Sequence, residues 1–411
     1  MLEIYLATVV FLVAVLMTAT AGLYLPAFFV LCYMLPFLPL LAAPFGGDSV
    51  FWPTAVFIFP ADAWEVSALS QIWLVSSIGL IVGLWASRVR MPFLVWRRGE
   101  YERNLAVKAG SLQRLVALVL VASLVSVRFF FGIDAESNSA FRSMELVICA
   151  LLLLCWTFAL YGRHRIYFVL TVGLFLLYVW SQVRTGDRDF FTVAIALMLM
   201  GVMRVGGGRG RLLTLGVVGM LLLLIGAVIS MVRMDVEITP ASLLEFLAFN
   251  SWNATILPVI WMVQAEWTSD FLLYGKTYLD LLTSVVPSPI FHLYGLEKPI
   301  HMDNPAFWFQ IPNMGGMHAA GVALRNFGLI GVGVQCAVLT YMYCRLEHRC
   351  RSRPTMWSTF LYLCVAASVM HTVWYGLIAF FNTLLLVCIL YFIFSIRVTV
   401  LKSETMRLKG T

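Results

Sequence analysis

The chain has 411 residues, of which 61% are hydrophobic and only 12% are charged, and its mean hydropathy is +0.91. A soluble domain carries about twice this share of charged residues, and a β-barrel would show short alternating segments instead of long apolar runs. The net charge of +7 comes from basic segments between the apolar runs, so it does not indicate a nucleic-acid partner. We therefore predict an all-α polytopic integral membrane protein, with residues 1–411 forming a single membrane domain.

Eleven apolar runs predict about 11 transmembrane helices, because each is long enough, or nearly long enough, to cross a bilayer. The first run has no basic leader before it and no small-residue cleavage site after it, so we expect it to be retained as a span. Strong helix breakers within the spans are expected only in the second run, at Pro26, Pro36 and Pro39. The runs cover residues 4–21, 23–43, 65–87, 115–131, 144–161, 166–182, 190–203, 212–232, 319–343, 356–371 and 376–396.

Charge in the connecting segments alternates with the spans. One set of segments holds 20 Lys and Arg against 4 Asp and Glu, and the rest of the chain holds 8 and 17. Basic segments of a membrane protein stay in the cytoplasm. We therefore expect a cytoplasmic C-terminus, an N-terminus outside, and a large extracytoplasmic loop, 233–318, between spans 8 and 9. The basic segments are 88–114, 162–165, 204–211, 344–354 and the tail after residue 396.

The large loop is expected to be ordered and partly helical. The capping-box spacing Ser242-x-x-Glu245, after Thr239-Pro240, predicts the start of one helix. Thr277-x-x-Asp280 predicts the start of a second, short helix that Pro287 ends, and the five prolines from there to Asn313 predict an extended lid. A long ordered loop is usually functional, so a site is expected in the loop or beneath it.

Arginines near spans on the extracytoplasmic side are exceptions to the charge pattern. Arg184 and Arg188 lie between two spans, Arg233 begins the large loop, and Arg325 lies just inside the apolar run that follows the loop. Charges at this depth are usually paired or functional. One interpretation is a set of ion pairs with neighbouring carboxylates. The other is an anion site, because guanidinium binds phosphate oxygens bidentately. The neighbouring carboxylates are Asp187, Asp189, Asp235 and Glu237.

Three of the six histidines, His292, His301 and His318, lie in the large loop. His318 follows a Gly-Gly-Met stretch directly before a span, where the glycines let the backbone approach another group closely. Neutral imidazole is the usual general base at neutral pH, so His318 is the first candidate for a base. Its alternative is a plain interfacial residue. His301 is the next candidate, with a structural or surface role as its alternative.

No metal site and no cofactor are predicted. None of the eight cysteines lies between residues 233 and 328, and the chain has no CxxC motif or His/Cys cluster. The glycines of residues 206–210 lack the strand and the Gly-Lys-Ser/Thr motif of a nucleotide-binding loop. The carboxylates of the large loop show no pair at a spacing typical of a hydrolase.

Four loose motifs occur in order between about residues 180 and 345. They are Gly186-Asp-Arg188, Arg233, Gly275-Lys-Thr-Tyr278 followed by Pro287 and Lys298-Pro299, and Asn326-Phe327-Gly328-x-x-Gly331. This order resembles that of the bacterial oligosaccharide repeat-unit polymerases, the Wzy-type O-antigen polymerases. The chain departs from the family pattern at Val322 and Ser288, where members often carry a glutamate and a basic residue. His318, ten residues before Gly328, is similar in placement to a histidine of the related O-antigen ligases.

The resemblance implies a fold of the type found in the integral membrane glycosyltransferases (GT-C-like), in a bacterial inner membrane, with the active site facing the periplasm. It implies transfer of a growing glycan from undecaprenyl pyrophosphate to the terminal sugar hydroxyl of another lipid-linked repeat unit. The implied partners are these lipid-linked oligosaccharides, membrane lipids and a chain-length regulator protein. The catalytic residues would be His318 and Arg233, and the residues binding pyrophosphate or glycan would be Arg184, Arg188, Arg325, Lys276, His301 and Tyr278.

Two alternatives stand beside the polymerase. The first is an O-antigen ligase, which transfers a finished glycan to a different acceptor. The second is a transporter or flippase of polysaccharide or lipid, which is typically built from inverted repeats and from charged or broken helices at mid-membrane. The chain shows no long internal repeat, and no charged residues accompany the prolines of the second run.

Overall fold

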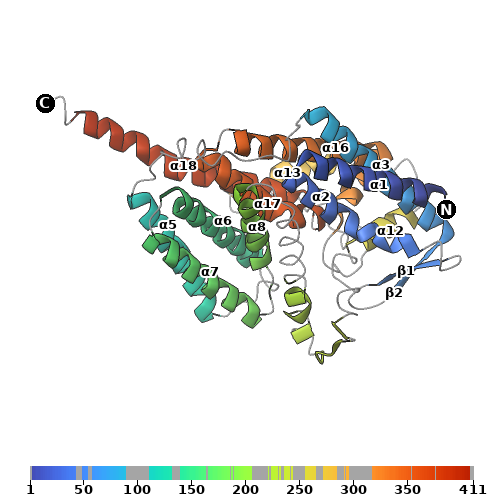
Figure 1. Cartoon of the computed structure of the whole chain (residues 1–411), viewed down its shortest axis with the longest axis horizontal. Coiled ribbons are helices and arrows are strands. Elements are labelled where there is room, and N and C mark those ends of the chain that lie inside the picture. The colour runs from blue at the N-terminus through green and yellow to red at the C-terminus, as the bar shows by residue number, and fades with distance from the viewer. Residues whose placement is uncertain are drawn as a thin grey trace. The chain divides into compact units, whose positions relative to one another are not determined.

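The computed structural model shows a chain built largely of helices (Figure 1). The helices are α1 (Leu2–Ala21), α2 (Tyr24–Met34), the 3-10 helix η1 (Leu35–Ala42), α3 (Ala63–Ser87), α5 (Ser111–Phe131), α6 (Ser139–Gly162), α7 (Arg165–Thr185), α8 (Phe190–Val205), α12 (Leu257–Gln264), α13 (Lys276–Ser284), α16 (Ala319–Ser352), α17 (Met356–Trp374) and α18 (Ile378–Arg407). The structure describes residues 2–42, 49–53, 58–88, 111–131, 139–162, 165–185, 187, 189–205, 221, 224–229, 231–232, 236–240, 242–243, 255–264, 272–284, 291, 293–295, 317–352, 354–374 and 376–407.

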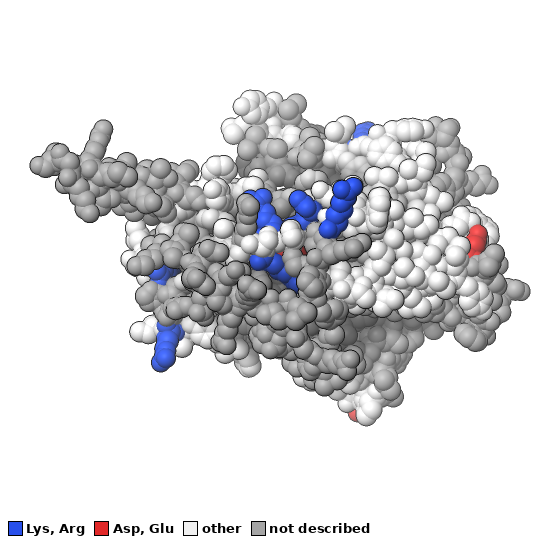
Figure 2. Space-filling model, turned by 45° about the horizontal axis from the view of Figure 1, so that its top comes forward, with Lys and Arg blue, Asp and Glu red and all other residues white. Residues whose placement is uncertain are grey.

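Among the described helices, seven are long and apolar enough to cross a membrane, and three more are apolar but shorter. These helices coincide with ten of the eleven predicted spans, and most of the remaining run, 212–232, lies outside the described residues. Outside the grey atoms, most of the face shown in Figure 2 is white, so few of its described residues are charged. The prediction of a helical membrane protein is confirmed, and the number of eleven spans stays a prediction.

The described residues include one two-stranded sheet, which was not predicted from the sequence. Strand β1 (Ser49–Pro53) pairs antiparallel with β2 (Ile58–Asp62), between η1 and α3. The residues Val-Phe-Trp in β1 are of the β-branched and aromatic types that favour strands. Both strands are edges of the sheet, and edge strands tolerate the proline that each contains.

Packing divides the chain into two compact units. Unit 1 comprises residues 1–94, 238–348 and 368–381, and unit 2 comprises residues 95–237, 349–367 and 382–411. Within unit 1, α1 packs along α3 and also against α2. Within unit 2, α5, α6 and α7 pack on one another, and α8 packs on α6 and α7.

Helix α16 in unit 1 is broken at its ninth and tenth residues. Phe327 has φ −140° and ψ 20°, and Gly328 has φ 61° and ψ −153°. A positive φ combined with this ψ is essentially restricted to glycine. The apolar run 319–343 predicts one continuous span here, and strong breaks are expected only at the prolines of the second run. That expectation is wrong, because this break depends on a glycine and not on a proline.

The two halves of α16 fold back on each other at the break. The side-chain amide of Gln335 donates a hydrogen bond to the carbonyl oxygen of Ala319 over 2.8 Å. A Cβ added at Gly331 would lie 2.6 Å from the carbonyl oxygen of Ala323. In a straight helix these pairs would be about 24 and 12 Å apart. The second half alone, residues 329–352, is about 36 Å long, which is enough to cross a bilayer.

Helix α3 lies directly against the second half of α16. A Cβ added at Gly79 would overlap the carbonyl oxygen of Gly333, and one added at Gly83 would overlap that of Ala337. The spacing is four residues on both helices, so the two run parallel through a contact of small residues. Such contacts let helix backbones approach closely in membrane proteins.

We expect Gly79→Ala to destabilise the protein, because the added methyl group has no room beside Gly333. Overpacking of this kind costs about 1–3 kcal/mol, and it should lower the thermal unfolding midpoint of the detergent-purified protein. Gly173→Ala on α7 is the matched control, because an added Cβ there meets nothing within 4 Å. Equal midpoints for the two variants would contradict the close contact.

Candidate functional site

The loop before α13 and the break in α16 contact each other in unit 1, and we call this contact, between residues 272–278 and 325–328, the clasp. The backbone N–H groups of Leu273 and Tyr274 donate hydrogen bonds over 2.9 and 3.1 Å to the last two carbonyl oxygens of the first half-helix. A helix end leaves such carbonyls without partners inside the helix. The loop therefore supplies the partners that the break removes.

Side chains complete the clasp. The buried amide of Asn326 donates hydrogen bonds to the hydroxyl of Thr277 and, over 2.8 Å, to the carbonyl oxygen of Val322. The hydroxyl of Tyr278 donates to the side-chain oxygen of Gln335 over 2.6 Å. Burial raises the pKa of Tyr278 above its usual value, which keeps this donor protonated. The start of α13 is thus bonded to both halves of α16.

Two glycines permit the close packing of the clasp. Gly275 has φ 90° and lies against the ring of Phe327, at 3.0 Å from where its Cβ would be. The same phenylalanine ring stacks on Tyr278, with ring centroids 6.1 Å apart and planes 12° apart. Gly275 and Tyr278 belong to one sequence motif, and Phe327 and Gly328 belong to another. The structure brings these two motifs into direct contact.

The clasp carries two of the cations that the sequence analysis named. Lys276 is exposed at the first position of α13, and Arg325 is partly buried in the last turn of the first half-helix. Tyr278, named with them, lies two residues after Lys276. Lys276 and Arg325 are therefore placed on one structural element, with N–H donors suited to an anion or a polyol, whereas the hydroxyl of Tyr278 already donates to Gln335.

His318 caps the first half-helix of α16 and is completely buried. Its Nδ1 accepts a hydrogen bond from the backbone N–H of Ala320 over 3.2 Å, so the ring proton lies on Nε2. That Nε2–H donates to the carbonyl oxygen of Tyr33 over 3.0 Å. Burial lowers the pKa of the imidazole to about 3, so the ring is neutral at physiological pH.

The surroundings of His318 are aromatic. Its ring packs edge-on against Tyr33 and Phe37, with centroids 4.6 and 5.3 Å away, and Phe37 stacks on Trp73 near the middle of α3. A general base needs a free lone pair within reach of its substrate, and both nitrogens of His318 are already engaged. We therefore correct the predicted role of His318 from a base to a buried helix cap.

Arg184 lies in the last turn of α7, in unit 2, and is exposed. One interpretation of the sequence paired the arginines of this turn with Asp187. In the structure, Asp187 Oδ2 accepts hydrogen bonds from Arg128 over 2.5 Å and from the hydroxyl of Thr185 over 2.8 Å. Among the described residues, Arg184 forms no ion pair. The arginine that neutralises this carboxylate comes from α5.

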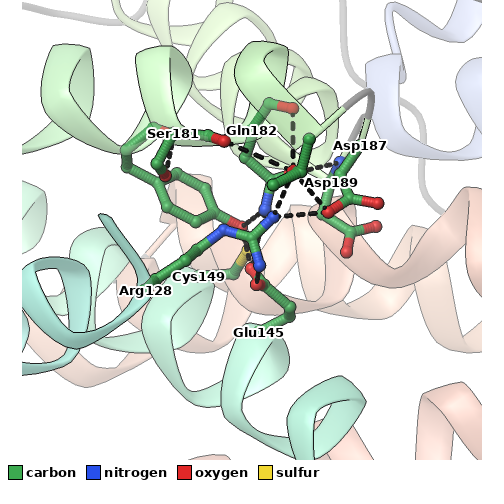
Figure 3. A network of polar contacts seen from close by, with 9 residues as sticks. Arg128, Glu145, Cys149, Ser181, Gln182, Asp187 and Asp189 are labelled. Carbon is green, nitrogen blue, oxygen red and sulfur yellow. Dashed lines mark hydrogen bonds and ion pairs between the residues drawn. The ribbon is translucent and has the colours of Figure 1, made fainter. Parts of the chain in front are cut away.

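Arg128 is the centre of a buried polar network that sequence reasoning missed (Figure 3). Its guanidinium also donates to Oε1 of Glu145 on α6. The other carboxylate oxygen of Glu145 accepts from the hydroxyl of Tyr178 and the amide of Gln182, both on α7 and both at 2.7 Å. Arg128 is 1% exposed and Glu145 is 3% exposed. Two opposite charges are thus enclosed among three apolar helices.

A signal for this network is present in the sequence. Arg128 lies within the predicted span 115–131 and Glu145 within 144–161. An ionisable residue inside a span is by default a functional candidate with a partner. The arginines between spans were interpreted by this rule, whereas the pair inside the spans was overlooked.

Three of the predicted site residues, Arg188, Arg233 and His301, lie outside the described residues. Among the described residues, no group of three or more His, Cys, Asp or Glu side chains could hold a metal ion. The cations that the structure offers are Lys276 and Arg325 at the clasp and Arg184 at the α7 terminus. Such groups bind and stabilise negative charge.

Comparison of the chain with protein-family models, with curated proteins and with solved structures gives no match. The fold and the side chains define a helical membrane protein with two separately packed units. The assignment of a function rests on the residues themselves.

We expect the stability of the protein to fall as the pH falls below about 6.5, in part because of His318. The folded state keeps this imidazole neutral down to about pH 3, whereas an unfolded chain protonates it near pH 6.5. The contribution of this one group has a limiting slope of about 1.4 kcal/mol per pH unit. Thermal unfolding midpoints at pH 7 and pH 5 measure it.

His318→Gln should reduce the difference between these two midpoints, because the amide can replace both hydrogen bonds without titrating. His371→Gln is the control, since His371 is only partly buried. An unchanged pH difference in His318→Gln would contradict a neutral, buried imidazole.

Proposed function

We propose that the chain is a membrane glycosyltransferase that polymerises lipid-linked oligosaccharide repeat units. The donor is a growing glycan on undecaprenyl pyrophosphate, and the acceptor is the terminal sugar hydroxyl of another lipid-linked repeat unit. The proposal places the reaction at the outer face of a bacterial inner membrane, with a chain-length regulator as a further protein partner. It needs no nucleotide and no cofactor, because the sugar–pyrophosphate bond already holds the energy.

The clasp is the observation that carries this proposal. Two of the four motifs on which the resemblance to the Wzy-type polymerases rests meet there, through Thr277 with Asn326 and Tyr278 with Phe327. They lie about 50 residues apart in the sequence, and their contact presents Lys276 and Arg325 on one element. The other two motifs, Gly186-Asp-Arg188 and Arg233, fall within the sequence range of unit 2.

The proposed chemistry uses these residues as follows. The acceptor hydroxyl oxygen forms a bond to the anomeric carbon of the donor sugar, and the bond from that carbon to the pyrophosphate oxygen breaks. The electron pair leaves with the pyrophosphate, where guanidinium and ammonium groups stabilise the added negative charge. We assign this role to Arg184, Arg188 and Arg233, with Lys276, Arg325, His301 and Tyr278 binding pyrophosphate or glycan. The proton of the acceptor hydroxyl passes to a base other than His318.

A transporter is the second candidate, because the structure contains a broken apolar helix, as transporters often do. In such proteins the freed backbone groups coordinate the cargo. Here the carbonyl oxygens of Arg325 and Asn326 are bonded to the loop before α13, and that of Val322 is bonded to Asn326. These oxygens already have partners inside the protein. The break therefore fits a structural role better than a cargo site.

Incubation of the purified protein with a defined undecaprenyl-pyrophosphate oligosaccharide tests the proposal. We expect a ladder of products, each longer by one repeat unit. Transfer only to an added lipid A core, with no lengthening on the lipid carrier, would identify a ligase instead. A substrate that keeps its length under all conditions would contradict both transferases and favour transport.

Arg184→Ala and Arg233→Ala are expected to slow elongation by about 100-fold or more, because each removes a cation from the leaving pyrophosphate. The rate of ladder formation at saturating acceptor measures the effect. Arg165→Ala is the matched control, since Arg165 is an exposed arginine at the opposite end of α7. Full-length product from both variants at the control's rate would remove these arginines from the site.

A further inference from the structure

The buried network of unit 2 holds the turn between α7 and α8 in place. The backbone N–H of Asp187 donates to the carbonyl oxygen of Gln182 over 2.9 Å, and that of Asp189 donates to the side-chain oxygen of Gln182 over 3.2 Å. The side chains of the network point toward one another from α5, α6, α7 and this turn (Figure 3). Arg128 is the one cation in the drawn network, and it joins all of these elements.

Stability alone is a weak reason for such an arrangement. Charges buried in an apolar bundle lose their hydration, and replacing a buried ion pair by apolar side chains is often neutral or stabilising. Glu145 has both oxygens bonded inside the bundle. Asp187 differs, because its side chain is 13% exposed and lies in the turn itself. Arg128 therefore reaches from the buried interior to a carboxylate at the edge.

Asp187 is also the carboxylate closest in sequence to Arg184. An exposed carboxylate three residues from an exposed arginine would attract it and compete with any anionic ligand. This competition is absent from the structure, because the Asp187 carboxylate already accepts hydrogen bonds from Arg128 and Thr185. Arg184 remains in the last turn of α7 with no ion pair among the described residues.

We propose that Arg128 is a positioning residue: by binding Asp187 from within the bundle it fixes the α7–α8 turn and keeps Arg184 free for an anionic ligand. The ligand named here, the pyrophosphate of a lipid-linked donor, rests on the proposed function. The coupling of Arg128 to Arg184 through Asp187 is independent of the proposed function. It is a property of the turn and is measurable without substrate.

The test is the electrostatic potential at position 184, read by a thiol introduced as Arg184→Cys. Two methanethiosulfonate reagents of similar size, one carrying a negative and one a positive charge, label this thiol, and the ratio of their rates reports local charge. The protein without the introduced cysteine serves as the blank, since seven of the eight native cysteines are buried. A purely structural disturbance would change both rates together and leave their ratio unchanged.

Adding Arg128→Gln is expected to lower the negative-to-positive rate ratio by about threefold or more, because it frees the Asp187 carboxylate to approach position 184. In an Asp187→Asn background the same substitution should change the ratio far less. This double-mutant cycle separates an effect through Asp187 from the direct field of Arg128, which would be the same in both backgrounds. Arg165→Gln should leave the ratio unchanged in either background.

Equal falls in the two backgrounds, or no fall in either, would overturn the proposal. If Arg128→Gln does not yield a folded protein, Arg128→Met combined with Glu145→Leu replaces both members of the buried pair and leaves no charge enclosed alone. The same fall in ratio is expected from that double variant, and an unchanged ratio overturns the proposal equally.

The labelling uses no lipid-linked sugar, so a negative result there does not contradict the proposed polymerase. Failure of the wild-type protein to elongate a glycan would remove only the identity of the ligand.

Discussion

The requirement that backbone polar groups find partners within the protein governs this structure, because an apolar bundle in lipid has no water to offer them. Breaking α16 at Phe327-Gly328 frees the carbonyl groups at the end of its first half. The break is sustained because Leu273 and Tyr274 donate to those carbonyls. The position of α13 and the fold of α16 therefore depend on each other. Removing the loop would leave the break without partners, and straightening α16 would leave the loop without acceptors.

The same requirement explains two charged or titratable side chains that are buried in unit 1. The carboxylate of Glu347 accepts hydrogen bonds from the backbone N–H groups of Tyr24 and Leu25, over 3.0 and 2.7 Å, at the start of α2. His318 does the same for Ala320 at the start of α16. Both are helix caps placed inside the protein. These two buried side chains thus supply the hydrogen bonds that water gives to the helix starts of a soluble protein.

Hydropathy and charge alternation were sufficient to predict where the chain is helical, because spans need long apolar runs and those runs are local. They did not predict the hairpin in α16, since the break at Phe327-Gly328 lies within an apolar run and depends on the distant residues 272–274 for its partners. The motifs Gly275–Tyr278 and Asn326–Gly328 were identified from the sequence, but their contact was not.

His318 was misread for a related reason: a histidine beside glycines at a loop boundary has the same local pattern whether its nitrogens are free or bonded. Arg128 and Glu145 were visible as charges within spans, and only their pairing needed the structure.

The loss of His318 as a base changes what the proposed reaction must depend on. In transfer from a pyrophosphate donor, the largest change of charge occurs on the leaving oxygen, and fixed cations stabilise it. Proton removal from the acceptor contributes less when the leaving group is already an anion of weak basicity. Fixed cations beside the leaving oxygen therefore matter more to glycosyl transfer from a lipid pyrophosphate than to hydrolysis, which must activate water. In unit 2, Arg184 is exposed while the nearby carboxylate of Asp187 forms an ion pair with Arg128. At this turn the acid is neutralised from inside the bundle and the cation is left at the edge, and the proposed anionic donor would use that cation.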